Sequence, residues 1–338
     1  MEAYRSLSAA EVKLIAGDYY QERARKAQAV EAPRVVLVGG QPGAGKSKAA
    51  ELVRDELSRQ GGYIHIDADR MRERIPLGGS RPTSQETQAD AGRLVQALRT
   101  LAVEGKRNVL EEGTYRDSAA AESFLRARRG DGYSVELLAV ATPRAQSVLG
   151  VYKRHEDQHA SQVVNPRMVE ESYHDLAMAG FRDTLSRVGH LLDRVRVVDR
   201  DGAVLYDSAR AENQHASALA ALDEGQRLKP ERLEAVASDW QTVAAAAAGR
   251  GAPKPYQDAV QAHARDAAAR LYLRDSALKL AKEHGLTGAA LDEAKKQISA
   301  MAAAASSVKP MQVVDSSVKT PPVLTPVRST GSARTPER

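Results

Sequence analysis

The chain has 338 residues, enough for about two domains at roughly 150 residues each. It contains no cysteine, which excludes disulfides, thiolate nucleophiles and cysteine-bound metals, and its 42% hydrophobic and 28% charged residues are ordinary for a soluble globular protein. The net charge of +5 would favour a nucleic-acid ligand only if the basic residues gathered on a folded surface.

The first two hundred residues alternate between helical patterns and short apolar runs. Residues 8–30 predict a helix that begins with a capping box, with Ser8 as N-cap and Glu11 three residues later. Five apolar runs then predict strands: Val35–Val38, Tyr63–Ile66, Val109–Leu110, Val135–Val140 and Val195–Val198. Asp201-Gly202 is a hairpin signal, which adds an antiparallel edge strand over Val204–Tyr206. This order predicts an α/β fold, a mainly parallel sheet flanked by helices.

A phosphate-binding loop follows the first predicted strand. Eight consecutive residues match G-x-x-x-x-G-K-[ST]: Gly40, Gln41, Pro42, Gly43, Ala44, Gly45, Lys46 and Ser47. The loop opens a helix predicted over Lys46–Arg59, so backbone N–H groups and the helix N-terminus both face the phosphates. We expect Lys46 to reach the β- and γ-phosphates of ATP or GTP and Ser47 to hold Mg²⁺. The alternative is a glycine-rich turn that matches by chance.

The second predicted strand ends in Asp67, at the sheet edge where ligands bind in α/β proteins. A carboxylate beside a phosphate-binding loop is placed to accept the proton of an acceptor hydroxyl, as in a kinase. The alternative is an N-cap for a helix over Arg70–Arg74, for which Asp69 stands nearer the helix start. No N-K-x-D motif and no apolar strand ending in Asp-Glu occurs, which argues against a GTPase, a motor or a helicase.

Two further segments carry candidate ligand-binding residues. The third strand runs into Glu112, Thr114 and Arg116, which would contact a polar substrate, unless this is an ordinary strand end. Val151–Asp175 is rich in arginine and histidine, and we interpret it as a mobile lid whose arginines cover the transferred phosphate. A solvated charged helix is the alternative to a lid. A metal site is a further alternative, but His155 and His159 lack a third ligand at the usual spacing.

The remainder of the chain predicts helix and then disorder. Residues 211–305 are alanine-rich with helical spacing, broken by a Gly/Pro segment over 249–255, and Pro230 suits the first turn of a helix toward Trp240. Ser306–Arg338 is proline-rich and carries five cations and two anions, which is +3 of the total charge. Because the rest is nearly neutral, we expect no nucleic-acid partner. No apolar run nears the roughly 20 residues that span a bilayer, so we expect a cytoplasmic protein without a membrane partner.

Several separated motifs, in order, resemble those of the zeta toxin family, the P-loop kinases of bacterial toxin–antitoxin systems. The resemblance covers about residues 8–210 and implies a kinase domain over 1–210, whereas the helical region predicted over 211–305 and the disordered tail predicted over 306–338 lie outside it. It rests on GGQPGAGKS (39–47), HIDADRMRERIP (65–76), EGTYR (112–116), Arg154 and Arg167 thirteen residues apart, His174-Asp175, and VVDRDGAVLYDS (197–208).

The resemblance implies a toxin that phosphorylates the 3′-hydroxyl of the amino sugar of UDP-N-acetylglucosamine. It assigns phosphate binding to Lys46, the base to Asp67, and stabilisation of the γ-phosphate to Arg154 and Arg167. Glu112 and Thr114 would contact the sugar nucleotide, and a small helical antitoxin would block the ATP site. It also implies a bacterial, cytoplasmic kinase, with secretion into another cell left open. One position departs from the family pattern, since Gln96 stands where a helical glutamate is used near the sugar.

Two other functions stay open at this point. One is a kinase of the same fold that phosphorylates another small molecule or nucleotide. The other is a nucleotide-binding regulatory or interaction protein, which the base and the two arginines disfavour. For residues 211–305 we consider a built-in inhibitor, a docking platform for a partner, and an adaptor for secretion or conjugation.

Overall fold

The computed structural model describes residues 4–304, except 81, 84–85 and 164–165. Its centre is one six-stranded sheet in the order β2-β3-β1-β4-β5-β6, in which the first five strands are parallel and β6 is antiparallel to β5. The strands confirm the sequence prediction, including the edge hairpin: β1 (Arg34–Gly39), β2 (Ile64–Asp67), β3 (Val109–Gly113), β4 (Ser134–Ala141), β5 (Arg194–Asp199) and β6 (Val204–Asp207).

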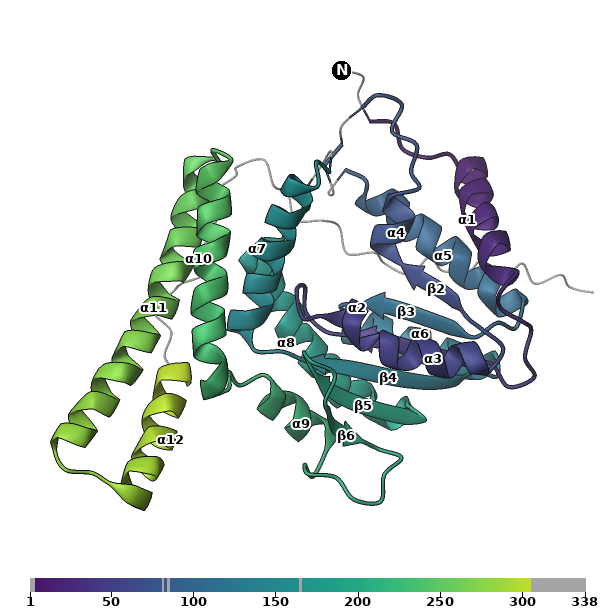
Figure 1. Cartoon of the computed structure of the whole chain (residues 1–338). Helices are drawn as coiled ribbons and strands as arrows, with labels where there is room; N and C mark the ends of the chain where they lie inside the picture. The colour runs from purple at the N-terminus through teal and green to yellow at the C-terminus, as the bar shows by residue number, and fades with distance from the viewer. Residues whose placement is uncertain (1–3, 81, 84–85, 164–165, 305–338) are drawn as a thin grey trace, which may run out of the picture.

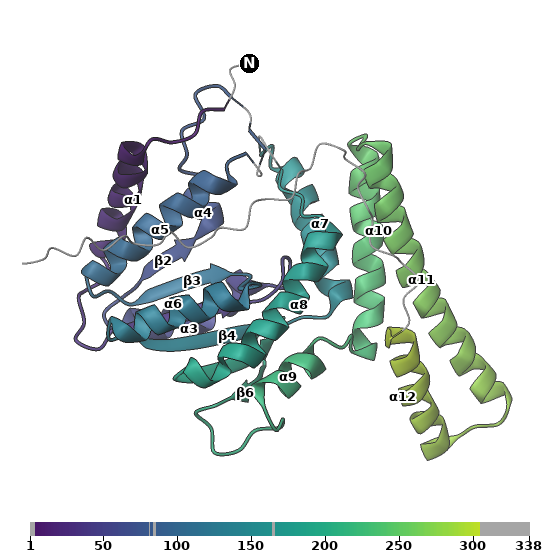
Figure 2. The same cartoon turned by 180° about the vertical axis from the view of Figure 1, so that it is seen from behind.

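Helices cover both faces of this sheet (Figures 1 and 2). Alternate residues of β1 separate the two cores, since Val36 and Val38 pack toward one helical layer and Val35 and Leu37 toward the other. The first layer is α2 (Lys46–Ala49) and α3 (Glu51–Arg59). The second contains α1 (Ala9–Ala24), α5 (Gln88–Glu104), α6 (Ser118–Gly130), α8 (Glu171–Val188) and α9 (Ala218–Gly225). Three short elements complete this part: α4 (Ala68–Arg72), the 3₁₀ turn η1 (Gly189–Leu191) and the 3₁₀ turn η2 (Pro230–Arg232).

The predicted helix boundaries hold at their starts better than at their ends. Ser8 caps α1 through the expected capping box, with Glu11 bonded back to the Ser8 backbone. The helix ends at Ala24 instead of residue 30, because Val30 N–H donates to the Lys106 carbonyl (3.0 Å) and so pairs with another segment. The helix expected over residues 46–59 is interrupted at Ala50, which keeps right-handed helical angles.

The C-terminal part is helical, as predicted. It comprises α10 (Leu233–Gly249), α11 (Lys254–Glu283) and α12 (Gly288–Ala304), and the Gly/Pro segment separates the first two. Figures 1 and 2 show α10 and α11 as a hairpin whose α10 arm lies against α7 (Arg144–Ala160). The predicted disordered tail lies outside the described residues. Among the described helices, none is long and apolar enough to cross a membrane.

Candidate active site

A cavity of about 410 Å³ opens at the carboxyl ends of β1, β2 and β3. Parallel strands end at the same edge of a sheet, so residues far apart in the chain meet there. The cavity brings together ten residues predicted from sequence: Pro42, Gly43, Gly45, Lys46, Ser47, Asp67, Glu112, Thr114, Arg154 and Arg167. Three groups of this set matter for chemistry: the phosphate-binding loop, a pair of carboxylates and a pair of arginines.

The phosphate-binding loop is curled by left-handed glycines, Gly43 at φ +73° and Gly45 at φ +96°. A Cβ on Gly43 would lie 2.0 Å from the Ser147 carbonyl oxygen, so only glycine fits there. The loop residues divide by role: Pro42, Gly43 and Gly45 line the cavity, whereas Gln41 is buried beneath it and donates to the Thr142 carbonyl (2.6 Å). The loop is therefore shaped and anchored by contacts with the protein itself.

Lys46 folds back over this loop and donates from Nζ to the carbonyl oxygens of Gly40 (3.0 Å) and Gln41 (3.1 Å). Burial first, and then the nearby charges of Arg154 and Arg167, lower the pKa of the Lys46 ammonium to about 8, although the charge of Glu112 opposes them. An ammonium held among other cations is stabilised by a bound polyanion. The loop therefore presents a site for phosphate.

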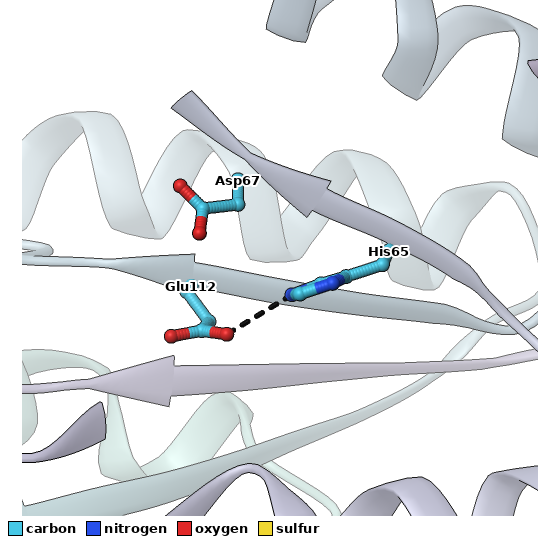
Figure 3. A group of neighbouring side chains, drawn as sticks. All are labelled: His65, Asp67 and Glu112. Atoms are coloured by element: carbon cyan, nitrogen blue, oxygen red, sulfur yellow. Dashed lines mark hydrogen bonds and ion pairs between the residues drawn. The ribbon is translucent and has the colours of Figure 1, made fainter. Parts of the chain in front are cut away.

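The carboxylates Asp67 and Glu112 end neighbouring strands and are paired in register. Figure 3 shows both side chains on the same side of these strands, with the His65 ring pointing at Glu112. His65 Nε2 lies 3.0 Å from Glu112 Oε1, and Ser47 Oγ donates to Glu112 Oε2 at 3.0 Å. One ligand atom each of His65, Asp67 and Glu112 lies within 4.8 Å of the others. Carboxylate and hydroxyl oxygens are the donors that Mg²⁺ prefers, so these oxygens with Ser47 fit that ion.

Asp67 also caps a helix, which corrects one prediction. Its Oδ1 accepts from the Asp69 backbone N–H (2.8 Å) and it is the N-cap of α4, a place that the sequence assigned to Asp69. The reason is that Asp67 ends β2 in extended conformation, as an N-cap requires, whereas Asp69 lies in the first helical turn and is paired with Arg72 and Arg167. Asp67 still faces the cavity.

The environment moves the pKa values of the two carboxyls in opposite directions. Burial raises the pKa of Asp67, and the charges of Asp69 and Glu112 add to the rise. Burial also acts to raise the pKa of Glu112, but the hydrogen bond and charge of His65, with the Ser47 hydrogen bond, outweigh it and lower that pKa. Such a split separates a group that takes up a proton from one that stays ionised.

Two arginines, Arg154 and Arg167, line the same cavity as these acids. Arg154 lies on α7, and its Nε and Nη2 atoms are buried without a hydrogen-bond partner among the described residues. Burial, and then the charge of Arg167, lowers the pKa of Arg154. Arg167 is itself paired with Asp69. A buried guanidinium with unused donors is a site that an anion would complete.

Comparisons with known proteins give the family of the chain. The zeta toxin family model matches residues 18–211, more than half of the chain. The chain belongs to the zeta toxin family. It is similar to toxin zeta of Enterococcus hirae (26% identity over 200 residues, 56% of this chain and 69% of that protein) and to toxin PezT of Streptococcus pneumoniae serotype 4 (27% over 198 residues, 55% and 76%). Family membership makes it a small-molecule kinase of the toxin type.

Two solved structures share the fold of this zeta toxin family member. The PezAT chromosomal toxin–antitoxin system of Streptococcus pneumoniae aligns with a TM-score of 0.60 at 24% identity, over 70% of this chain and 98% of that one. The AvrRxo1-ORF1:-ORF2 complex aligns with a TM-score of 0.52 at 14% identity, over 78% and 96%. These structures confirm the predicted fold class.

In this zeta toxin family kinase, some residues lie elsewhere than the sequence suggested. Arg116 does not line the cavity but stacks over the ring of Tyr173 at 4.9 Å, and it is Tyr173 that reaches the cavity wall. Gln96 is exposed, lies 3.4 Å from the Arg99 guanidinium and is also absent from the cavity lining. His155 and His159 contact each other (Nε2–Nε2, 3.2 Å), and the described residues supply no third ligand for a metal there.

Sequence reasoning missed Arg200, which lies in the turn between β5 and β6. Its Nη1 donates to the Gly43 carbonyl (2.5 Å) and the Gln146 carbonyl (3.2 Å), and the side chain lines the cavity. The Asp-Arg-Asp-Gly segment indicated only a hairpin, although it stood within the motif shared with the family. A cation in a tight turn at the carboxyl end of a strand was the signal available.

Proposed function

We propose that this zeta toxin family kinase transfers the γ-phosphate of ATP, or of GTP, to the 3′-hydroxyl of the amino sugar of UDP-N-acetylglucosamine. The observation that carries the proposal is that Asp67, Lys46 and Arg154 line one and the same cavity. This places a base, a phosphate-binding cation and an anion-stabilising cation around one point. Relatives named toxin zeta and toxin PezT support the toxin role.

The phosphate-binding loop holds the nucleotide. Its N–H groups and Lys46 bind the β- and γ-phosphates, and Arg200 holds the loop in place through the Gly43 carbonyl. The solved AvrRxo1-ORF1:-ORF2 structure with ATP supports a nucleotide triphosphate as the donor. Mg²⁺, when bound near Ser47 and the two strand-end carboxylates, would neutralise phosphate charge.

Asp67 is the proposed base. Its carboxylate accepts the proton of the acceptor hydroxyl while that oxygen bonds to the γ-phosphorus and the bond from phosphorus to the ADP oxygen breaks. The raised pKa of Asp67 makes it a better proton acceptor than an ordinary aspartate. Arg154, whose buried donors have no partner among the described residues, would bind the transferred group, with Arg167 beside it.

Glu112 and Thr114 are the proposed contacts to the sugar nucleotide. Glu112 is held ionised by His65 and Ser47, and so offers an acceptor to sugar hydroxyl groups. The position of Gln96 favours a second candidate, a kinase of the same fold with another small-molecule acceptor. The family resemblance places an acidic side chain near the sugar, at the position of Gln96. Gln96 is uncharged and lies outside the cavity lining, so this residue does not supply that contact.

The partner proposed for this kinase is a small helical antitoxin that covers the nucleotide cavity. The solved neighbours support it, since PezAT is a toxin–antitoxin system and AvrRxo1-ORF1 was solved in complex with ORF2. A cytoplasmic bacterial location follows from the same proposal.

The test is a phosphoryl-transfer assay on the full chain. The protein is incubated with ATP, Mg²⁺ and UDP-N-acetylglucosamine, and mass spectrometry measures the addition of one phosphate to the sugar nucleotide. Asp67→Asn and Lys46→Met are the inactive controls. Phosphorylation of a different small molecule, with none of UDP-N-acetylglucosamine at high enzyme concentration, would favour the second candidate.

A further inference from the structure

We propose that the α10–α11 hairpin is a positioning element of the kinase, which holds α7 so that Arg154 faces the transferred phosphate. The inference rests on the role given to Arg154 in the proposed function. The hairpin lies beyond residues 18–211, which the family model matches, so the family resemblance assigns it no role. Three features of the described structure carry the proposal: the faces of α7, a buried cluster around Glu171, and an ion pair beside Arg154.

Helix α7 lies between the central sheet and the hairpin (Figures 1 and 2). Tyr152 and Glu156 are one turn apart and share a face, whereas Arg154 is two residues from each and so about 200° around the helix from Tyr152. Tyr152 and Glu156 contact hairpin residues, and Arg154 lines the cavity. The hairpin therefore sets the position of the helix whose opposite face carries Arg154.

The contact between α7 and the hairpin is an aromatic and aliphatic core. Tyr152 is fully buried, and its ring meets that of Trp240 on α10 edge-on at 5.2 Å. Trp240 in turn stacks on His263 of α11, with ring centroids 4.5 Å apart and planes 9° from parallel. Val148 and Leu149 of α7 belong to the same core. Close-packed contacts of this kind transmit displacement instead of absorbing it.

Glu171 joins three helices through one buried carboxylate. Its Oε1 accepts from Tyr152 OH (3.0 Å, α7) and lies 2.7 Å from His263 Nε2 (α11), while its Oε2 accepts from Arg144 (2.9 Å, α7). Burial acts to raise the pKa of Glu171, but the hydrogen bonds and charges of these partners, His263 first, lower it overall. Because Glu171 is only 3% exposed, it depends on every one of these partners.

Glu171 also begins α8, directly after the segment that carries Arg167. The Glu171 carboxylate therefore connects α7, which bears Arg154, to the start of α8, which follows the segment that carries Arg167. His263, which is 92 residues away from Glu171 in sequence, is the hairpin's contribution to that contact.

An ion pair close to Arg154 is a second contact between the hairpin and α7. Arg250, at the end of α10, donates to both oxygens of Glu156 at 2.8 and 2.9 Å, and its guanidinium lies over the Tyr256 ring at 5.2 Å. A two-fold hydrogen-bonded arginine–carboxylate pair fixes direction as well as distance. Glu156 is 7% exposed, so solvent screens this pair little. It restrains α7 within two residues of Arg154.

Arg154 depends on such support because of its own contacts. Its buried Nε and Nη2 have no hydrogen-bond partner among the described residues, so the backbone of α7 decides where the guanidinium lies. The described parts of α10, α11 and α12 contribute no residue to the cavity lining. This favours a positioning element over the built-in inhibitor considered from sequence, since an inhibitor would cover the cavity.

The test removes the ion pair between Arg250 and Glu156 without changing a residue that lines the cavity. In the full chain, Arg250→Leu breaks the pair with Glu156, and Arg274→Leu is the matched control, because Arg274 pairs with Glu234 (2.8 Å) within the hairpin itself. We expect Arg250→Leu to lower kcat about tenfold or more, as the loss of a transition-state contact does, with ADP affinity within about twofold. Trapping of ADP with aluminium fluoride, which imitates the transferred group, should weaken in parallel, and Arg274→Leu should behave as wild type.

Rescue separates positioning from general destabilisation. The double variant Glu156→Arg/Arg250→Glu restores an ion pair with reversed polarity, and we expect it to recover most of kcat. If Arg250→Leu does not fold, Arg250→Lys keeps the charge but loses the two-fold hydrogen bond, and it should show the same split between kcat and ADP affinity. Unchanged kcat in a folded Arg250 variant, or an equal fall in kcat and ADP affinity, would overturn the inference.

Arg154→Ala in the same assays distinguishes this inference from the proposed function. If Arg154→Ala leaves kcat and aluminium fluoride trapping intact, the proposed role of Arg154 fails. If Arg154→Ala abolishes both while Arg250→Leu changes neither, only the positioning inference fails.

Discussion

Asp67 and Glu112 stand side by side at the ends of β2 and β3, paired in register, yet their surroundings move their pKa values in opposite directions. Glu112 is hydrogen-bonded by Ser47 and His65, which are distant in sequence, whereas Asp67 accepts a hydrogen bond from the N–H of Asp69, two residues further on. Two adjacent carboxylates thus differ in readiness to take a proton. The following predictions rest on this difference and on the groups around it.

Replacing the proposed base should remove catalysis but leave the fold. Asp67→Asn keeps a side-chain oxygen for the N-cap of α4, so we expect little change in stability and a fall in kcat of about 10²–10⁴-fold. Asp67→Ala loses the cap as well and should cost about 1 kcal/mol of unfolding free energy. Steady-state rates and urea unfolding measure both, and full turnover by Asp67→Asn would rule out the base.

The activity should depend on pH through the same residue. Asp67 is competent only when ionised, and its pKa in the protein lies above the ordinary value of 3.8. We therefore expect kcat/KM to fall as the pH drops through this raised pKa, and to recover as the pH rises. A pH–rate profile with Asp67→Glu as the comparison measures it. An acid limb at or below the ordinary aspartate value would contradict the assignment.

The buried Lys46 ammonium should lower the free energy of unfolding of the protein without nucleotide. Its pKa is lowered to about 8, so between about pH 8 and the ordinary 10.5 the unfolded chain binds more protons than the folded one. Stability contributed by this residue therefore rises with pH through that window. Lys46→Met removes the unfavourable buried charge, and we expect a gain of about 1–2 kcal/mol at pH 7, reduced because Lys46 is partly open to solvent.

The same substitution at Lys46 should also weaken nucleotide binding. The Lys46→Met variant should lose ATP affinity by about 10²-fold or more. Differential scanning calorimetry and isothermal titration measure the two effects in one sample. A variant that is both less stable and still able to bind ATP would contradict this account of Lys46.

Replacing Arg200 should weaken nucleotide binding more than it lowers kcat. Its hydrogen bond to the Gly43 carbonyl holds the phosphate-binding loop, so Arg200→Ala should weaken ATP binding about tenfold and lower kcat much less. Arg210→Ala, an exposed arginine at the far end of β6, is the control and should bind ATP as wild type does. Equal loss of kcat and ATP affinity would instead place Arg200 at the transferred phosphate.

Local patterns explain what could be predicted before the structure. The strands, the capping box at Ser8 and the break between α10 and α11 depend on neighbours in the chain, and all are present. The differences from the sequence predictions depend on tertiary context. Whether Asp67 or Asp69 caps α4 depended on where β2 ended, and whether Arg116 faces the cavity depended on Tyr173, which belongs to a distant helix.

The sequence by itself determined the phosphate-binding loop, because one contiguous segment carries both the glycines that curl it and the lysine and serine that serve it. Tertiary structure alone decided how the rest meets it. The pKa of Asp67 depends on burial and on Glu112 from another strand, and His263 reaches Glu171 across 92 residues. Charge interactions in a protein depend on distance and on exclusion of water, and only the packed chain sets these two quantities.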